Sequence, residues 1–237
     1  MKSNHLKAAC TSLHNHANEA DIEVLQRFFK TGPGDYGEGD VFIGVRVPII
    51  RRVAKEHQAL PLREATTLLK SRIHEERMLA LMILMLQYKM GTPDDTARIY
   101  DLYMAQTAHI NNWDLIDVTA PHIVGAYLRD KPRAPLYTFA RSQSIWERRI
   151  AIISTLHFIK HSDFSDTLAI AEILRHDTHD LIHKAVGWML REVGNRDLQT
   201  EEAFLNKHYR TMPRTMLRYA IEKFPEPERQ HYLKGRI

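Results

Sequence analysis

The chain has 237 residues, of which 44% are hydrophobic and 26% charged, a composition typical of a globular protein with a substantial core. Its longest nearly apolar stretch, residues 78–87, is about half of what a membrane span requires, and residues 1–10 lack the apolar segment of a signal peptide. The composition argues against a membrane protein or a largely disordered one. We expect a cytoplasmic protein, associated with the nucleoid in a bacterium.

The net charge of +4 is mild for a protein that binds nucleic acid, so the distribution of the charges is more informative than their sum. The acidic residues are dispersed, whereas basic residues cluster at Arg46, Arg51, Arg52 and Lys55, at Arg148 and Arg149, at Lys184 and Arg191, and at Arg210, Arg214, Arg218 and Lys223. If these clusters align, one face of the protein is basic. The single cysteine, Cys10, cannot form an internal disulfide and is interpreted as structural.

Glycines and prolines fall mostly between segments whose apolar residues recur at helical spacing, and alternating strand patterns are nearly absent. The sequence therefore predicts an all-α fold. Pro48, Pro61 and Pro93 support three helix starts, because a first-turn N–H has no partner within the helix and its loss costs nothing. In chain order, the predicted helices span residues 4–17, 20–30, 48–57, 61–70, 74–89, 93–106, 113–129, 133–141, 145–160, 164–175, 178–194, 199–210 and 214–224.

The clearest predicted loop is Thr31–Gly44, which contains five glycines. No strand precedes it, and its glycines are not directly followed by a lysine and a serine or threonine, so the loop does not match a phosphate-binding P-loop. It lies directly before the basic run from Arg46 to Lys55. Contact between this loop and a DNA strand is therefore a secondary hypothesis.

From residue 61 onward, shorter and longer helices alternate, and the second helices begin near residues 74, 113, 145, 178 and 213. This period is typical of stacked antiparallel helix pairs of the HEAT or armadillo type. We therefore expect a single domain over residues 1–237, a solenoid whose second helices line a concave surface. Superposing these helices predicts a basic ladder that suits a DNA phosphate backbone, formed by Arg77, Arg149, Lys184 and Arg218. The alternative is that each is an ordinary solvated residue.

Trp113 and Asp117 are four residues apart, so they share one face of a predicted helix and can both face one ligand. Trp188 lies on another predicted helix, beside the small residue Gly187. From these segments alone, a core position is the favoured interpretation of both tryptophans. Of the adjacent Arg148 and Arg149, at most one faces a given groove, and Arg149 is in register with the ladder; its planar guanidinium can donate two hydrogen bonds to a phosphate.

Four segments together resemble the AlkD family of DNA alkylation repair glycosylases: FIGVRVPIIRRVAK at 42–55, NNWDLID at 111–117, IWERR at 145–149 and KAVGWMLRE at 184–192. They follow the order and spacing of that family, and the resemblance spans about residues 22–224. It implies a HEAT-like solenoid that binds duplex DNA on its concave face. It also implies hydrolytic release of cationic 3-alkyl- and 7-alkylpurines without base flipping.

The resemblance also implies roles for individual residues. Asp117 matches the catalytic carboxylate, and Trp113 and Trp188 match the aromatic residues beside the lesion nucleotide. Arg149 matches the arginine that contacts the DNA there. The other predicted DNA contacts are Arg46, Arg51, Arg52, Lys55, Arg77, Arg148, Lys184, Arg191 and Arg218. The sequence departs from the family in having Asn112 where relatives can have a second tryptophan, and in its longer loop at residues 31–44.

The expected partner is double-stranded DNA carrying alkylated purines, bound by a monomer without a cofactor. One alternative is a helical-repeat module that binds damaged or branched DNA, or a protein, without catalysis. A second is a metal-dependent hydrolase built on His176, His179 and His183. The sequence has neither an HExxH motif nor a cysteine pair, and we predict no metal site.

Overall fold

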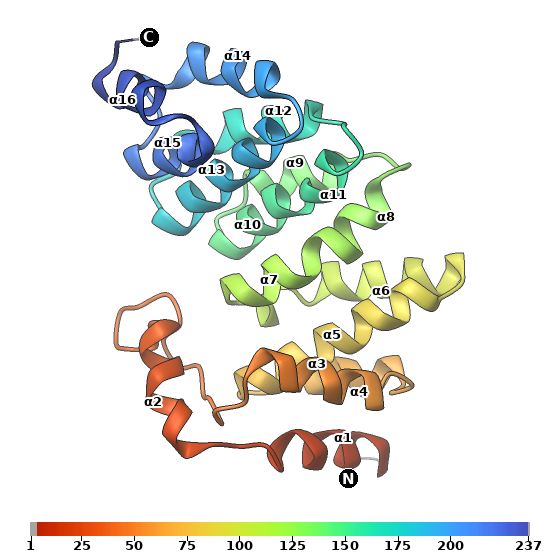
Figure 1. Cartoon of the computed structure of the whole chain (residues 1–237). Coiled ribbons are helices and arrows are strands. Elements are labelled where there is room, and N and C mark those ends of the chain that lie inside the picture. Colours follow the sequence, from red (N-terminus) through yellow and green to blue (C-terminus); the bar gives the residue numbers. More distant parts are fainter. Residues whose placement is uncertain (1–3, 237) are drawn as a thin grey trace. The chain divides into compact units, whose positions relative to one another are not determined.

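The computed structural model describes residues 4–236, which form helices joined by loops (Figure 1). An isolated β-bridge joins Val41 and Ile73. The predicted all-α, helical-repeat fold is confirmed. The chain divides into two compact units, an N-terminal unit up to Thr119 and a C-terminal unit from Ala120 onward. A single domain over the whole chain stays a prediction. No helix within residues 4–236 is long and apolar enough to cross a membrane.

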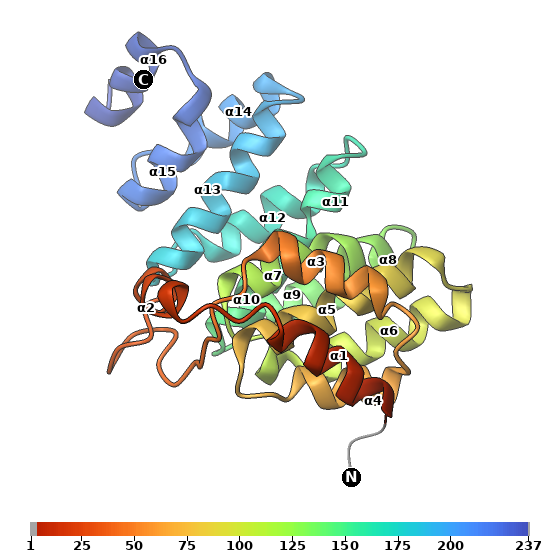
Figure 2. The ribbon, with the colours of Figure 1, turned by 60° about the horizontal axis from the view of Figure 1, so that its bottom comes forward.

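The N-terminal unit is built around one long helix, α5, whose first eleven residues are all buried. Helices α3, α4 and α6 pack against α5, and α1 packs against α3 and α4, as Figure 2 shows for α1 and α3. The helices of this unit are α1 (Asn4–His14), α2 (Glu19–Phe28), α3 (Val47–Glu56), α4 (Leu62–Leu69), α5 (His74–Met90), α6 (Pro93–Ala105), the 3₁₀ turn η1 (Thr107–His109) and α7 (Trp113–Ala120).

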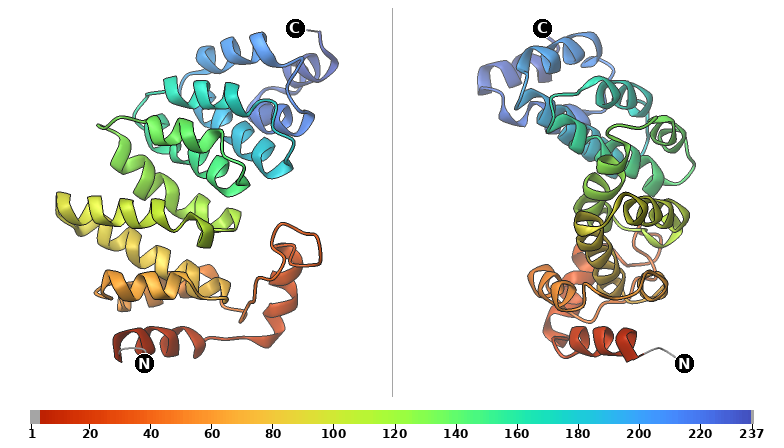
Figure 3. Two further views of the ribbon diagram at one scale, coloured as in Figure 1. Left: turned by 180° about the vertical axis from the view of Figure 1, so that it is seen from behind. Right: turned by 90° about the vertical axis from the view of Figure 1, so that its right-hand side faces the viewer.

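Helix α2 is not buried in this unit, and the loop that follows it is held by hydrogen bonds to Glu75 of α5. None of the residues of α2 is fully buried, and Figure 3 shows that α2 turns away from the direction of α1. The loop then returns to α3, and the Glu75 carboxylate accepts hydrogen bonds of 2.9–3.2 Å from the backbone N–H groups of Ile43, Gly44 and Val45. Gly44 has φ +81°, and a Cβ there would lie 2.0 Å from the Asn18 carbonyl oxygen, so this close approach requires glycine.

The C-terminal unit is built around α13, which packs against α10, α12, α14 and α15 (Figure 1). Its elements are the π-helical turn η2 (Pro121–Gly125), α8 (Ala126–Leu128), α9 (Ala134–Ala140), α10 (Ile145–Ser154), α11 (Leu156–Ile159), α12 (Ser165–Leu174), α13 (Asp180–Gly194), α14 (Leu198–His208), α15 (Arg214–Ala220), the 3₁₀ turn η3 (Ile221–Lys223) and α16 (Glu226–Lys234). Helix α13 buries an apolar stripe that includes Ile182, Val186, Met189 and Val193, and Asp197 caps the first turn of α14.

The predicted helix starts agree with the structure to within two residues, and two of the longer predictions are divided. The predicted helix 113–129 passes through the π-helical turn that begins at Pro121, and the helix 145–160 is interrupted at Thr155. The sequence prediction also missed α16. The prolines at 225 and 227 precede and open this helix, and Gly235 ends it with φ +67°, which is the usual asymmetry of helix ends.

Candidate functional site

Trp113 and Asp117 lie one turn apart on α7, as predicted, and both are half-buried. Trp113 packs against two rings from the end of α2. Its indole stacks on Phe29 with ring centroids 5.3 Å apart, and Phe28 meets it edge-on at 5.6 Å. The Phe28 side chain is 61% exposed. The N-terminal unit therefore presents Trp113 within an aromatic cluster that is partly open to solvent.

The aromatic cluster continues inward to a histidine. Phe29 stacks on Phe42 at 5.2 Å, and both rings contact the imidazole of His74, at 4.9 and 4.6 Å. These rings come from α2, the following loop and α5, so the cluster holds three segments of the N-terminal unit together.

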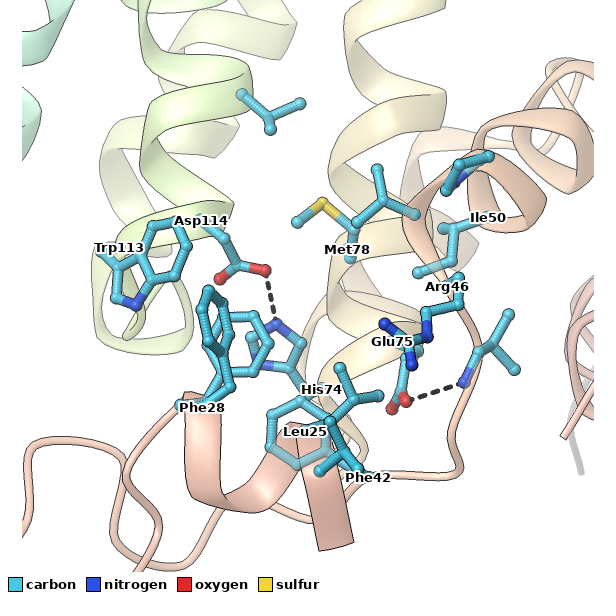
Figure 4. A pocket seen from close by; sticks show the side chains of 16 residues that line it. Leu25, Phe28, Phe42, Arg46, Ile50, His74, Glu75, Met78, Trp113 and Asp114 are labelled. Carbon is cyan, nitrogen blue, oxygen red and sulfur yellow. Dashed lines mark hydrogen bonds and ion pairs between the residues drawn. The ribbon is translucent and has the colours of Figure 1, made fainter. Parts of the chain in front are cut away.

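His74, the first residue of α5, is buried between two carboxylates. Its Nε2 lies 2.8 Å from Asp114 Oδ2 and its Nδ1 lies 3.1 Å from Asp40 Oδ2 (Figure 4 shows the bond to Asp114). Burial by itself would lower the pKa of His74, but the carboxylates of Asp114 and Asp40 outweigh it and raise the pKa to about 9. At neutral pH the ring is therefore an imidazolium that donates hydrogen bonds from both nitrogens.

Arg77 belongs to the same buried network. Its Nη2 lies 2.6 Å from Asp40 Oδ1, and its Nη1 donates hydrogen bonds to the carbonyls of Ser71 and Arg72. The side chain is only 3% exposed. The sequence predicts Arg77 as a DNA contact, but the structure places its guanidinium inside the N-terminal unit, where it stabilises Asp40 and the start of α5.

A cavity of about 460 Å³ lies between α2, α3, α5 and α7 (Figure 4). Most of its lining is apolar, including Leu25, Ile50 and Met78, and Trp113 and Asp114 form part of its wall on α7. Asp117 is not among the lining residues. The cavity therefore lies beside the predicted Trp113 and Asp117 pair and belongs entirely to the N-terminal unit.

Arg149 and Trp188, the other two predicted catalytic residues, lie in the C-terminal unit on the neighbouring helices α10 and α13. Arg149 is 5% exposed, and its Nη1 donates a hydrogen bond of 2.5 Å to the Leu181 carbonyl in the first turn of α13. Trp188 is half-buried and its indole N–H lies 3.3 Å from Glu192 Oε1. The contact at Leu181 thus fixes Arg149 against the helix that carries Trp188.

The structure corrects the register of the predicted ladder. Arg77 lies four residues after Ile73, the N-cap of α5. The residue four after Ser144, the N-cap of α10, is Arg148 and not Arg149. Arg149, Lys184 and Arg218 each lie one residue later, on α10, α13 and α15. The ladder therefore has three members, all in the C-terminal unit, where α13 packs against both α10 and α15. Lys184 is half-buried and Arg218 exposed.

The remaining predicted DNA contacts are distributed between the two units. Arg51, Arg52 and Lys55 are exposed along α3, and Arg46, at the N-cap of that helix, pairs with Asp21. In the C-terminal unit, Arg148 is bound by Asp177 and Arg191 by Glu222. The basic residues of α3 are thus open to solvent, as Arg218 on α15 is.

Two histidines of the cluster considered as a metal site, His179 and His183, form hydrogen bonds with backbone groups of the protein. His179 caps α13 by accepting a hydrogen bond from the Leu181 N–H, and His183 Nε2 lies 2.5 Å from the Asp177 carbonyl oxygen. Among residues 4–236, no group of three or more potential ligands is arranged to hold a metal ion.

The helical-repeat fold, with an aromatic and acidic pair on α7 of one unit and basic residues at equivalent positions of α10, α13 and α15 in the other, defines a class of all-α repeat protein. A sequence profile described as "DNA alkylation repair enzyme" matches residues 9–224. The chain belongs to this family.

Two solved structures share the fold. One is described as a predicted DNA alkylation repair enzyme from Enterococcus faecalis, with a TM-score of 0.70 and 14% identity over 89% of this chain and 98% of the other. The second is smu.31 from Streptococcus mutans UA159, with a TM-score of 0.52 and 14% identity over 94% of this chain and 100% of the other. No curated protein sequence matches the chain.

Sequence reasoning missed the buried residues that surround Trp113. His74 lies 34 residues from Asp40 and 40 residues from Asp114 in the chain, so no local sequence pattern brings the three together. The one signal present is the position of Asp114 in the first turn of α7, where an acidic residue is ordinarily explained by the helix dipole.

Proposed function

We propose that the protein is a monofunctional DNA glycosylase that hydrolyses the N-glycosidic bond of cationic 3-alkyl- and 7-alkylpurines in duplex DNA, without base flipping. The observation that supports this most directly is the pair formed by Trp113 and Asp117 on one face of α7, in a chain of the DNA alkylation repair enzyme family. We expect a monomer acting in the cytoplasm or on the nucleoid.

The proposed chemistry needs only one carboxylate. A purine alkylated at N3 or N7 carries a positive charge, so it departs without protonation by a general acid. Positive charge then develops on the deoxyribose, where Asp117 stabilises it and positions the attacking water. Trp113 and Trp188 attract the cationic nucleotide with their ring faces and exclude water, while Arg149 binds the adjoining phosphate. The family resemblance is the reason for assigning the C-terminal residues to the same reaction.

The decisive test is the Asp117→Asn variant assayed on methylated duplex DNA in the presence of a chelator. Release of 3-methyladenine and 7-methylguanine by the wild-type protein supports the glycosylase, and the variant is expected to lose release while keeping DNA affinity. Asp101→Asn, which changes an exposed aspartate on α6, is the matched control. Near wild-type excision of 7-methylguanine by Asp117→Asn would contradict the mechanism.

The alternative function is a helical-repeat module that binds damaged or branched DNA without catalysis. In that case the wild-type protein binds methylated DNA and releases no base. Loss of release only when chelator is added would instead indicate a metal-dependent hydrolase. The same assay therefore separates the three functions.

A further inference from the structure

We propose that His74 is a positioning residue: by bridging Asp40 and Asp114 it fixes the first turn of α7 and thereby the position of Trp113. Its effect on excision rests on the proposed function, because Trp113 and Asp117 lie on the same short helix. The structural part of the inference stands on the contacts of the N-terminal unit alone.

Three segments that are distant in sequence meet at His74. The histidine opens α5, Asp40 comes from the loop after α2, and Asp114 comes from the first turn of α7. The two imidazole nitrogens bind one carboxylate each, at 3.1 and 2.8 Å, and Arg77 binds the other oxygen of Asp40 at 2.6 Å. Because every member is buried, none of these bonds competes with bulk water.

The side chains of Asn112 and Asp114 connect this buried network to the first turn of α7. Asn112 Nδ2 donates to Asp40 Oδ2 at 3.3 Å, and Asn112 Oδ1 accepts from the backbone N–H of Trp113 at 2.8 Å. Asp114 Oδ1 accepts from the Leu115 N–H at 2.8 Å. The first N–H groups of a helix have no partner within it, and these two bonds satisfy those of Trp113 and Leu115 at the start of α7.

The Trp113 ring is held by a second route. Phe29 stacks on the indole and also contacts the His74 imidazole, which in turn stacks on Phe42. A change at His74 therefore acts on the indole through Phe29 as well as through the backbone. Trp113 is thus linked to His74 by hydrogen bonds at its backbone and by ring contacts at its side chain.

The charge of His74 matters for this bridge, because only the imidazolium donates from both nitrogens. The groups that act on it are Asp114 on α7, Asp40 on the loop and Arg77 on α5. Burial and the Arg77 charge favour the neutral ring, and the two carboxylates outweigh them, so the pKa of His74 is raised to about 9. The bridge is therefore complete at neutral pH and weakens as the pH rises through about 9.

The test measures Trp113 directly by fluorine NMR on protein labelled with 5-fluorotryptophan. The chain has three tryptophans, and the Trp113→Phe variant identifies the resonance of Trp113. In His74→Gln we expect that resonance to shift or broaden while those of Trp146 and Trp188, which belong to the C-terminal unit, stay in place. His57→Gln is the control, because His57 bonds Ser12 at 2.9 Å in the same unit and should leave all three unchanged.

A second variant, Asp114→Asn, and a pH titration of the wild-type protein keep the test decisive if His74→Gln does not fold. Asp114→Asn keeps the shape of the side chain but removes its charge, so it should move the same resonance. In the wild-type protein, the Trp113 resonance should change as the pH passes about 9, where His74 loses its proton. A Trp113 resonance that is unchanged in the folded variants and across this titration overturns the proposal.

Excision assays then separate this inference from the proposed function. In folded His74→Gln, the single-turnover rate constant for release of 7-methylguanine should fall by about 10-fold or more, with unchanged DNA affinity, because misplacement of a catalytic group costs rate more than binding. If wild-type protein releases no base, the proposed function fails and the Trp113 measurement still decides the positioning role. A displaced Trp113 with undiminished release overturns the catalytic consequence.

Discussion

Arg148 in α10 makes the hydrogen bonds that Arg77 makes in α5. Each guanidinium donates from Nη1 to the carbonyls six and five residues earlier in its own chain segment, at 3.1 and 3.3 Å for Arg77 and at 2.8 and 2.9 Å for Arg148. Each also pairs with an aspartate, Asp40 or Asp177, at 2.6 Å. The repeat thus uses an arginine to secure the loop before its second helix.

This relationship predicts that Arg148→Ala destabilises the protein before it affects DNA binding. The substitution leaves the Asp177 carboxylate buried without its ion-pair partner, so the free energy of unfolding should fall by about 3 kcal/mol. Chemical denaturation measures it, with the exposed Arg63→Ala of α4 as a control that should change little. Weaker DNA binding at unchanged stability would instead assign Arg148 to the DNA interface.

The one-residue error in the ladder shows what sequence periodicity can and cannot resolve. Apolar spacing fixed the helices to within a few residues, but Arg77 and Arg149 share a position only if the helix starts are known to the residue. The N-caps at Ile73 and Ser144 supply that register, and neither makes a side-chain capping bond that a sequence would reveal. The His74 network was missed for a different reason, because contacts over 34 and 40 residues leave no local pattern.

The corrected ladder predicts that Lys184 and Arg218, rather than Arg77, contribute to the salt dependence of DNA binding. If each neutralises one phosphate, the slope of log affinity against log salt should become shallower by about 0.9 in Lys184→Ala and in Arg218→Ala. Binding to an unmodified duplex at several salt concentrations measures this slope. Lys89→Ala, an exposed lysine in the last turn of α5, serves as the control. Slopes equal to wild type in both ladder variants would exclude a phosphate contact at these residues.

The raised pKa of His74 predicts a stability that depends on pH. Because the folded-state pKa is about 9 and the ordinary value is 6.5, the imidazolium contributes fully below about pH 6.5 and its contribution is lost as the pH rises through 9. The difference corresponds to about 3 kcal/mol in the free energy of unfolding. Denaturation at about pH 6 and about pH 9.5 should show this loss in the wild-type protein and a smaller one in His74→Gln. Equal losses in both proteins would assign the effect to other groups.

Gly187 explains how α13 and α15 approach closely beside Trp188. A Cβ at this residue would lie 2.4 Å from the Met216 carbonyl oxygen and 2.5 Å from Tyr219 Cβ, and the first of these is a backbone atom that no side-chain rotation can move. Alanine is favoured over glycine in a helix by about 1 kcal/mol, but overpacking against a fixed backbone costs about 1 to 3 kcal/mol. Since α15 must then move away from α13, Gly187→Ala should lower the free energy of unfolding.

The matched control for this substitution is Gly32→Ala, where the nearest atom to the added Cβ is the flexible Asp35 carboxylate at 3.1 Å. Chemical denaturation of both variants, together with the fluorine resonance of Trp188, measures the effect. We expect a displaced Trp188 resonance and reduced stability only in Gly187→Ala, because Trp188 is the next residue on α13. The helix that must move, α15, also carries Arg218. A Gly187→Ala protein as stable as wild type would mean that α15 shifts freely, and the ladder residue on it would then have no fixed place relative to α13.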